Sequence, residues 1–270
     1  QRPSEENLKL VDVGIEPRDA RIPAASANPM LAEIIAGKPR LIALNKSDLA
    51  DPAETRAWLA YFRAQGVRAV AIDANKGKGM KQLTQAAEDL ARPKTEKFVK
   101  NGGRGRAARC MILGIPNVGK SSLINRLAGA ARTKTANTPG LTRAKQWVKI
   151  GANLDLLDMP GILWPKFDDP EVGKRLAFTG AVKDDVLDIE ELACYLMDYL
   201  AAHYADTLTE RYKIEVEPGD TGYELLEKAW RKRGFLMRGA QVDTERMARI
   251  LLDEFRAGKL GRFTLETVED

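Results

Sequence analysis

The chain has little of what marks membrane-spanning, disulfide-rich or histidine-dependent proteins. No apolar run approaches the roughly 20 residues that cross a bilayer, and no signal-peptide pattern is visible. The two cysteines, Cys110 and Cys194, lie far apart in apolar segments, which favours buried thiols over a disulfide or a metal site. The one histidine, His203, falls near the end of a predicted helix, where a surface role is expected rather than a catalytic one.

What the chain does have is the size and composition of a soluble two-domain protein. It contains 270 residues, of which 44% are hydrophobic and 30% charged. Strand and helix patterns alternate up to about residue 165, so an α/β domain with a mostly parallel sheet flanked by helices is predicted over 1–165. Beyond it the strand signals fade and helical spacing of leucines continues, which predicts a small all-helical domain over 166–270.

Several helix boundaries are marked by their end residues. Asn28-Pro29 and Gly37 bracket one predicted helix. Asp188 and Asp243 are expected to open two later helices, and Thr221-Gly222-Tyr223-Glu224 is a capping-box pattern for a third.

The most informative motif is GIPNVGKS at residues 114–121, which fits G-x-x-x-x-G-K-[ST] at every fixed position. An apolar strand pattern at 110–113 precedes it and a helical pattern at 122–128 follows, which argues against a chance glycine-rich turn. Lys120 is expected to bridge the β- and γ-phosphates of a nucleotide, and the Ser121 hydroxyl to ligate magnesium. The predicted phosphate-binding residues are Asn117, Val118, Gly119, Lys120, Ser121, Ser122 and Gly161.

A second motif, Asn45-Lys46-Ser47-Asp48, follows the apolar strand pattern 41–44 and fits recognition of guanine. The Asp48 carboxylate can accept two hydrogen bonds from the guanine edge, which adenine does not offer. Asn45 can tie this loop to the phosphate loop, and the Lys46 stem can lie along the base. By itself such a tetrapeptide is an ordinary polar turn, so its meaning depends on the phosphate loop. Asp73 and Ala74 stand where a further base-side loop is expected, although the match is poor.

A third motif, Asp158-Met159-Pro160-Gly161, ends another apolar strand pattern. Asp158 can hold the magnesium shell, and the Gly161 N–H can sense the γ-phosphate. Thr142 is the preferred candidate for a switch threonine that ligates magnesium in the triphosphate state, and Thr138 is the alternative. Predicted magnesium ligands are therefore Ser121, Thr142 and Asp158.

The order of these motifs is unusual, because N-K-x-D precedes the phosphate loop and D-x-x-G comes last. In this the chain resembles circularly permuted GTPases, and more narrowly the ribosome biogenesis GTPase A family. Permutation also places the second domain directly after the switch segment, where the γ-phosphate can act on it. The resemblance rests on Asp19-Ala20-Arg21-Ile22-Pro23, Asn28-Pro29-Met30, 45–48, 114–121, Pro139-Gly140-Leu141-Thr142, 158–167 and Thr179-Gly180-Ala181, and it covers nearly the whole chain.

The resemblance implies a GTP-hydrolysing assembly factor for the large ribosomal subunit, whose affinity for ribosomal RNA changes with the bound nucleotide. It implies GTP or GDP, the large subunit and its rRNA as partners, no membrane, a monomer, and the bacterial cytoplasm, with the mitochondrial matrix as the alternative. The competing hypothesis is an RNA-binding module that nucleotide merely stabilises. Net charge of +5 and the cluster Lys228, Arg231, Lys232, Arg233 and Arg238 suit RNA contact, or simply a solvated face.

Hydrolysis is expected to be slow without help from the ribosomal subunit. Ile162 occupies the position of the glutamine that orients the attacking water in many switch GTPases. Relatives with asparagine at the Asn117 position use it to hold potassium; the alternative is that Asn117 only shapes the loop. The chain opens with Gln1 and lacks the family's P-G-H-M motif, so either its natural start lies upstream or its catalytic arrangement differs, and no general base is assigned.

Overall fold

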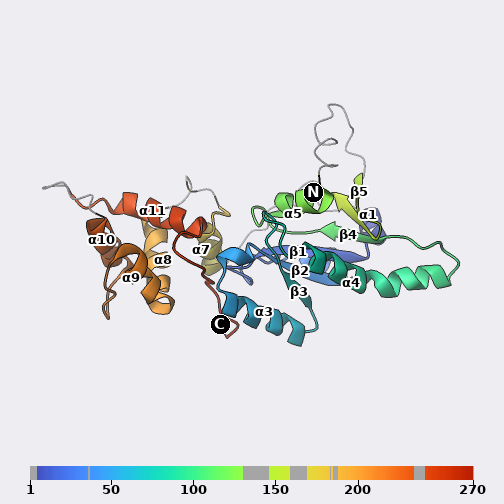
Figure 1. The fold of residues 1–270 in the computed structure, drawn as a ribbon, viewed down its shortest axis with the longest axis horizontal. Coiled ribbons are helices and arrows are strands. Elements are labelled where there is room, and N and C mark those ends of the chain that lie inside the picture. Colours follow the sequence, from blue (N-terminus) through green and yellow to red (C-terminus); the bar gives the residue numbers. More distant parts are fainter. Residues whose placement is uncertain are drawn as a thin grey trace, which may run out of the picture. The chain divides into compact units, whose positions relative to one another are not determined.

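The computed structural model describes residues 5–35, 37–129, 146–158, 169–182, 184, 188–233 and 241–269. The chain forms two compact units. The first contains residues 1–166 together with 266–270, and the second contains residues 167–265. Figure 1 traces the helices and strands of both units.

The first unit is built on a six-stranded sheet with the order β3-β2-β1-β4-β6-β5. All neighbouring strands pair in parallel except β5 and β6, which are antiparallel. This confirms the predicted mostly parallel sheet. The strands are β1 (Val13–Asp19), β2 (Arg40–Asn45), β3 (Arg68–Ala71), β4 (Ala108–Ile112), β5 (Gln146–Ile150) and β6 (Leu154–Asp158).

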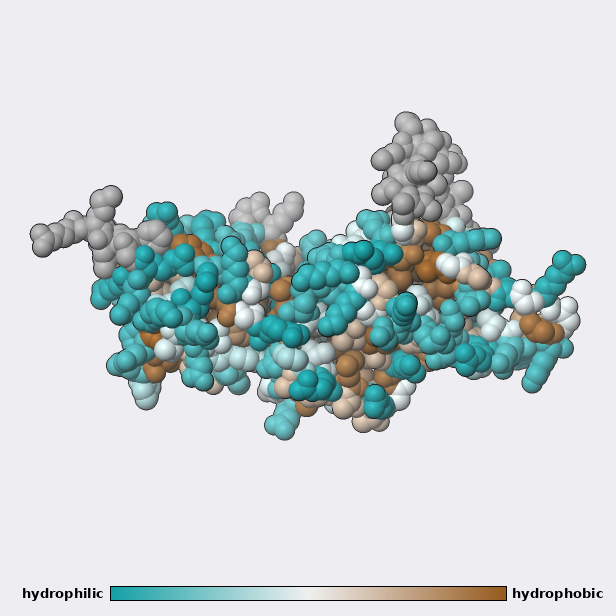
Figure 2. All heavy atoms as spheres, in the orientation of Figure 1, coloured by the Kyte–Doolittle hydropathy of each residue, from teal (hydrophilic) through white to brown (hydrophobic). Residues whose placement is uncertain are grey.

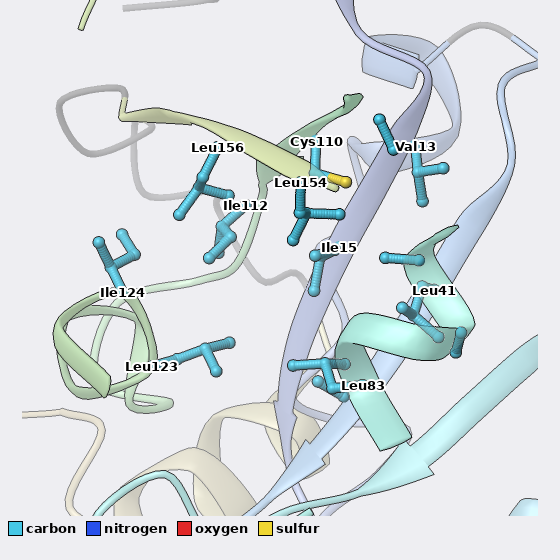
Figure 3. Close-up of a cluster of buried hydrophobic side chains, with 14 of the residues drawn as sticks. Val13, Ile15, Leu41, Leu83, Cys110, Ile112, Leu123, Ile124, Leu154 and Leu156 are labelled. Carbon is cyan, nitrogen blue, oxygen red and sulfur yellow. The ribbon is translucent and has the colours of Figure 1, made fainter. Parts of the chain in front are cut away.

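Helices cover both faces of this sheet because its strands carry apolar side chains on both sides. Cys110 and Ile112 of β4 face one cluster, whereas Met111 faces another, as alternation along a strand requires. The first face packs against α4 and α5, and Figure 3 shows part of this core. The other face packs against α2 and α3. The helices are α1 (Glu5–Leu10), α2 (Leu31–Ile35), η1 (Ser47–Leu49), α3 (Pro52–Ala64), α4 (Met80–Lys100) and α5 (Lys120–Ala128).

Every regular element described in the second unit is a helix. Three of the helices begin at side-chain caps that the sequence predicts, namely Asp188, Thr221 and Asp243. Each capping side chain accepts a hydrogen bond from the backbone N–H three residues further on, in the first turn of its helix, at Glu191, Glu224 and Arg246 respectively. The helices are α7 (Pro170–Phe178), α8 (Ile189–His203), α9 (Ala205–Tyr212), α10 (Gly222–Lys232) and α11 (Thr244–Arg256).

The last described residues belong to the first unit, a return that the sequence does not reveal. The Glu266 carboxylate accepts hydrogen bonds from the N–H groups of Ala24 and Ala25, at 3.1 to 3.2 Å. Its backbone carbonyl accepts one from Trp58 Nε1 at 3.1 Å. Glu266 is almost fully buried, so it anchors the chain end to the loop after β1 and to α3.

The two cysteines and the one histidine lie in regular elements of the fold. Both cysteines are free thiols, as predicted, although Cys194 is only half-buried. Burial raises the pKa of Cys110 to about 12 and that of Cys194 to about 11. His203 ends α8 and stacks on Tyr199. None of the helices that the structure describes combines the length and apolar character of a membrane span.

Candidate functional site

The predicted motifs meet at the carboxyl edge of the sheet, which is the side where the parallel strands end. Parallel strands have their carboxyl ends on the same side, so the loops after β1, β2, β3, β4 and β6 share that edge. The chain builds β1, β2 and β3 outward in one direction and then places β4 on the opposite side of β1. Ligands of such sheets bind in the crevice where the strand order reverses, which here lies between β1 and β4.

The phosphate loop follows β4 and leads into α5. Asn117 and Gly119 have φ angles of 65° and 90°, which curl the backbone before Lys120 starts the helix. Lys120, Ser121 and Ser122 therefore form the first turn of α5, where backbone N–H groups point toward the carboxyl edge and favour an anion. At Gly119 an added methyl group would collide with the Asn45 amide, so this position requires glycine on two counts.

Asn45 links the base loop to the phosphate loop, as the sequence predicts. Its Nδ2 donates a hydrogen bond to the Val118 carbonyl at 3.0 Å, and its Oδ1 accepts one from the Ala74 N–H at 3.0 Å. Asn45 is 3% exposed, so both bonds are shielded from water. One side chain thus joins loops from β2, β3 and β4, which lie far apart in the sequence.

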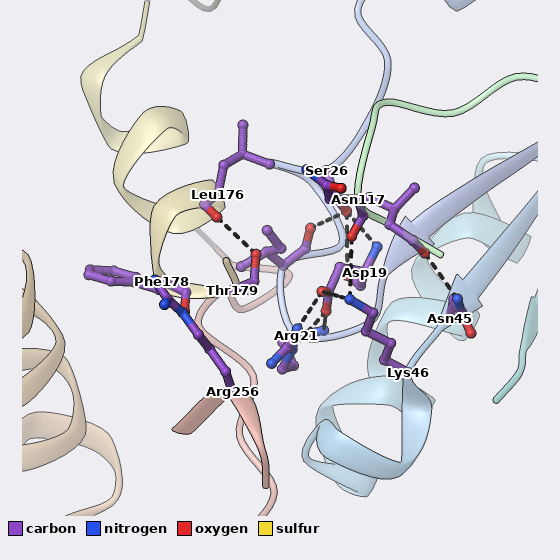
Figure 4. A network of polar contacts seen from close by, with 12 residues as sticks. Asp19, Arg21, Ser26, Asn45, Lys46, Asn117, Leu176, Phe178, Thr179 and Arg256 are labelled. Carbon is purple, nitrogen blue, oxygen red and sulfur yellow. Dashed lines mark hydrogen bonds and ion pairs between the residues drawn. The ribbon is translucent and has the colours of Figure 1, made fainter. Parts of the chain in front are cut away.

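Lys46 is held by a buried ion pair at the end of β1. Asp19 accepts hydrogen bonds from Arg21 Nε at 3.0 Å and from an Arg21 terminal nitrogen at 2.7 Å, and the Lys46 Nζ lies 3.9 Å from the same carboxylate. Lys46 Nζ also donates to the Asn117 carbonyl at 3.3 Å, as Figure 4 shows. Burial would raise the pKa of Asp19, but the Arg21 and Lys46 charges outweigh it and lower that pKa. Burial lowers the pKa of Lys46, opposed by Asp19.

The loop after β3 lies on the base side of the site. Ala74 bonds to Asn45, and its carbonyl accepts a hydrogen bond from Arg126 of α5 at 3.0 Å. The Asp73 carboxylate instead accepts from the Lys76 N–H and shapes its own turn. The segment Asp73-Ala74, whose match to a base-side loop is poor, therefore lies beside Asn45. Of its two residues, Ala74 is the one that bonds to the Asn45 side chain.

Other predicted residues lie at the same edge or outside the described residues. Asp48 is the middle residue of η1, and η1 begins directly after Lys46, whose backbone is left-handed. The Asp48 side chain is half-buried. Asp158 ends β6, whose partner β4 leads into the phosphate loop. The predicted residues outside the described ones are Thr138, Thr142, Gly161, Ile162 and Arg238.

The fold and this edge define a phosphate-loop GTPase domain whose base motif precedes its phosphate loop. A family model described as a 50S ribosome-binding GTPase matches residues 109–220. Ribosome biogenesis GTPase A of Bacillus cereus is 48% identical over 265 residues, covering 98% of this chain and 89% of that protein. Its counterpart in Priestia megaterium is also 48% identical, covering 97% and 91%.

A solved structure agrees with these relatives. The GDP-bound structure of YlqF superimposes with a TM-score of 0.68 at 26% identity, and the match covers 98% of this chain and 99% of that one. The chain therefore belongs to the ribosome biogenesis GTPase A family.

The network around Asp19 is not predicted by the motifs. From the sequence, Asp19 and Arg21 carry only part of a family resemblance, whereas in the structure they support Lys46. The available signal was an acidic and a basic residue two positions apart directly after an apolar strand, which is the place where side chains reach a shared edge.

Proposed function

We propose that the chain binds GTP across the crevice between the base loop and the phosphate loop, hydrolyses it to GDP and phosphate, and acts in assembly of the large ribosomal subunit. The observation that carries this proposal is the pair of buried hydrogen bonds from Asn45, which fix the two loops relative to each other. Asp48 and the Lys46 stem contact guanine, with Ala74 and Asp73 on the base side.

In the proposed complex the first turn of α5 holds the phosphates. Asn117, Val118 and Gly119 supply curled backbone, and Lys120 supplies positive charge. Gly161 and Ser122 complete the phosphate contacts. Magnesium suits this edge because the Ser121 hydroxyl, Asp158 and Thr142 offer oxygen donors, the ligands that this hard cation prefers. When bound, the ion neutralises phosphate charge.

We further propose that intrinsic turnover is slow and rises with potassium and with the large subunit. Ile162 has no hydrogen-bonding side chain with which to orient water. Asn117 adopts a left-handed conformation within the phosphate loop, and its side chain is proposed to hold potassium near the phosphates, where added positive charge stabilises the transition state.

The second unit is proposed to contact ribosomal RNA through α10. Lys228 pairs with Asp220 at 2.7 Å and Arg233 with Glu254 at 2.7 Å, so these two charges are partly neutralised within the unit. Arg231 and Lys232 line a groove of about 530 Å³ and have no carboxylate at ion-pair distance among the described residues. They are the better phosphate-contacting candidates of the basic cluster.

The test is multiple-turnover GTP hydrolysis with and without purified large-subunit particles, in potassium and in sodium buffer. The proposal expects faster turnover with particles and with potassium, and loss of both effects in Lys120→Ala. Equal rates under all conditions would contradict it.

The alternative, an RNA-binding module stabilised by nucleotide, is tested by the same variant. Normal association of Lys120→Ala with the subunit and normal assembly would favour that alternative. The protein is proposed to work as a monomer in the bacterial cytoplasm, which size-exclusion chromatography with light scattering and cell fractionation examine.

A further inference from the structure

The outer edge of the sheet at β3 carries a groove that the nucleotide site does not use. Among the strands that the structure describes, β3 pairs with β2 alone. Beyond it lies a groove of about 1110 Å³, lined by β3, the second half of α3 and the first half of α4. In Figure 1 the strand lies between these two helices, and in the same orientation Figure 2 shows pale and brown residues at the surface near α3 among hydrophilic ones. The edge is therefore accessible.

The groove lies where a further strand beside β3 would lie. α3 packs on the sheet face that carries Ile42 and Leu44, and α4 packs on the face that carries Leu41 and Ala43. The two helices thus lie on opposite faces, and both also line the groove beyond the last strand. A further strand placed beside β3 would lie between them. Four residues of β3 offer an edge of roughly 13 Å at about 3.3 Å per residue.

Backbone groups of β3 point into this groove. The Ile72 N–H donates to the Leu44 carbonyl at 2.8 Å, and the Ile72 carbonyl accepts from the Ser47 N–H at 3.1 Å. Because the peptide groups of successive residues point to opposite sides of a strand, those of Ala69 and Ala71 face away from β2. An edge of this kind is a template for pairing with another chain.

The charged residues that line the groove are all positive, although Asp89 of α4 lies near enough to interact electrostatically with Arg68. The lining contains four cations, all exposed, and no carboxylate. Among the described residues none of the four has a carboxylate at ion-pair distance. The cations are Arg63, Arg68, Lys78 and Lys81. They oppose pairing with a second copy of the same edge, since like charges would face each other, and they favour an acidic strand.

We propose that the β3 edge is a docking site for an extended, acidic segment of a partner protein, which adds to the sheet as a further strand. Backbone hydrogen bonds to the N–H and carbonyl of Ala69 and to the N–H of Ala71 hold the segment. Its acidic side chains alternate between Arg63 on the α3 wall and Lys81 on the α4 wall.

A nucleic acid fits this groove less well than a peptide. None of the lining residues is aromatic, so bases have no stacking platform. The floor consists of strand backbone with Val67, Ala69 and Val70, which suits main-chain pairing and small side chains. The groove ends at Gly79, whose backbone packs against the Ala71 carbonyl: a methyl group there would lie 2.6 Å from the carbonyl oxygen.

The test uses a fluorescent seven-residue peptide with three consecutive Glu between two pairs of Val, so that neighbouring Glu side chains reach both walls, with the full chain labelled with ¹⁵N-alanine. The proposal expects saturable shifts of the Ala69 and Ala71 amide signals and at least tenfold weaker binding by the double variant Arg63→Glu, Lys81→Glu. The matched control Arg56→Glu, Lys97→Glu changes the same net charge at exposed sites outside the groove and should bind within about twofold of wild type.

Two further measurements separate the other outcomes. Ala69→Pro removes an N–H that faces the groove without removing a bond to β2, so it should abolish peptide binding in a folded protein. If that variant does not fold, the wild-type amide shifts decide. Equal weakening in the control pair, shifts elsewhere, or shifts caused by an oligouridine but not by the peptide would each overturn the proposal.

Discussion

Replacing Asn45 with alanine tests whether the two nucleotide loops depend on one side chain. The change removes the donor to the Val118 carbonyl and the acceptor of the Ala74 N–H, both at 3.0 Å and both buried. A buried polar group left without its partner costs about 1–3 kcal/mol. Water entering the vacated space recovers part of this, so we expect the first unit to lose about 2–4 kcal/mol of unfolding free energy.

The same change should weaken nucleotide binding, because the loops are no longer fixed before the ligand arrives. A loss of about 1.4 to 2.8 kcal/mol corresponds to a 10- to 100-fold higher Kd for GDP. Fluorescence titration with a labelled GDP measures the Kd, and urea unfolding followed by tryptophan emission measures stability. Asn153→Ala, at an exposed site in the β5–β6 turn, is the control. If Asn45→Ala matches this control in both assays, the linking role of Asn45 is refuted.

Asp19→Asn should destabilise the protein by about 3 kcal/mol at pH 7; because the folded pKa of Asp19 lies below its ordinary 3.8, the wild-type advantage in urea unfolding should persist above pH 4 and shrink as pH falls through the folded value. A thiol reagent should label half-buried Cys194 before Cys110, and equal rates in the native protein would contradict the burial of Cys110. Glu266→Gln should cost about 1–2 kcal/mol in thermal or urea unfolding, whereas exposed Glu269→Gln should be neutral.

Local patterns in the sequence predicted much of the fold. Thr221 and Asp243 were recognisable as caps because a capping side chain and the N–H it satisfies lie within one helical turn. The apolar runs at 41–44 and 110–113 were recognisable as buried strands because both faces of a parallel sheet are covered. The order of the motifs, with N-K-x-D before the phosphate loop and D-x-x-G last, predicted a permuted domain.

Contacts between distant residues could not be predicted in this way. Glu266 bonds to Ala24 across more than 240 positions. A single carboxylate forms no periodic pattern in the sequence, so its partner cannot be predicted from local spacing. The Asp19–Arg21 pair was visible as residues but not as a support for Lys46, since that role depends on β1 and β2 being neighbours. The Asn45 link could be predicted because the base motif at 45–48 and the phosphate loop at 114–121 are expected to bind the same nucleotide, and this requires the two loops to lie close together.

The central claim, that the permuted chain closes one guanine-specific pocket, is tested most directly by base selectivity at Asp48. Wild type should bind GTP far more tightly than xanthosine triphosphate, and Asp48→Asn should reverse that preference, because an amide complements the xanthine edge. A titration in which Asp48→Asn still prefers GTP would show that Asp48 does not contact the base and would contradict the account.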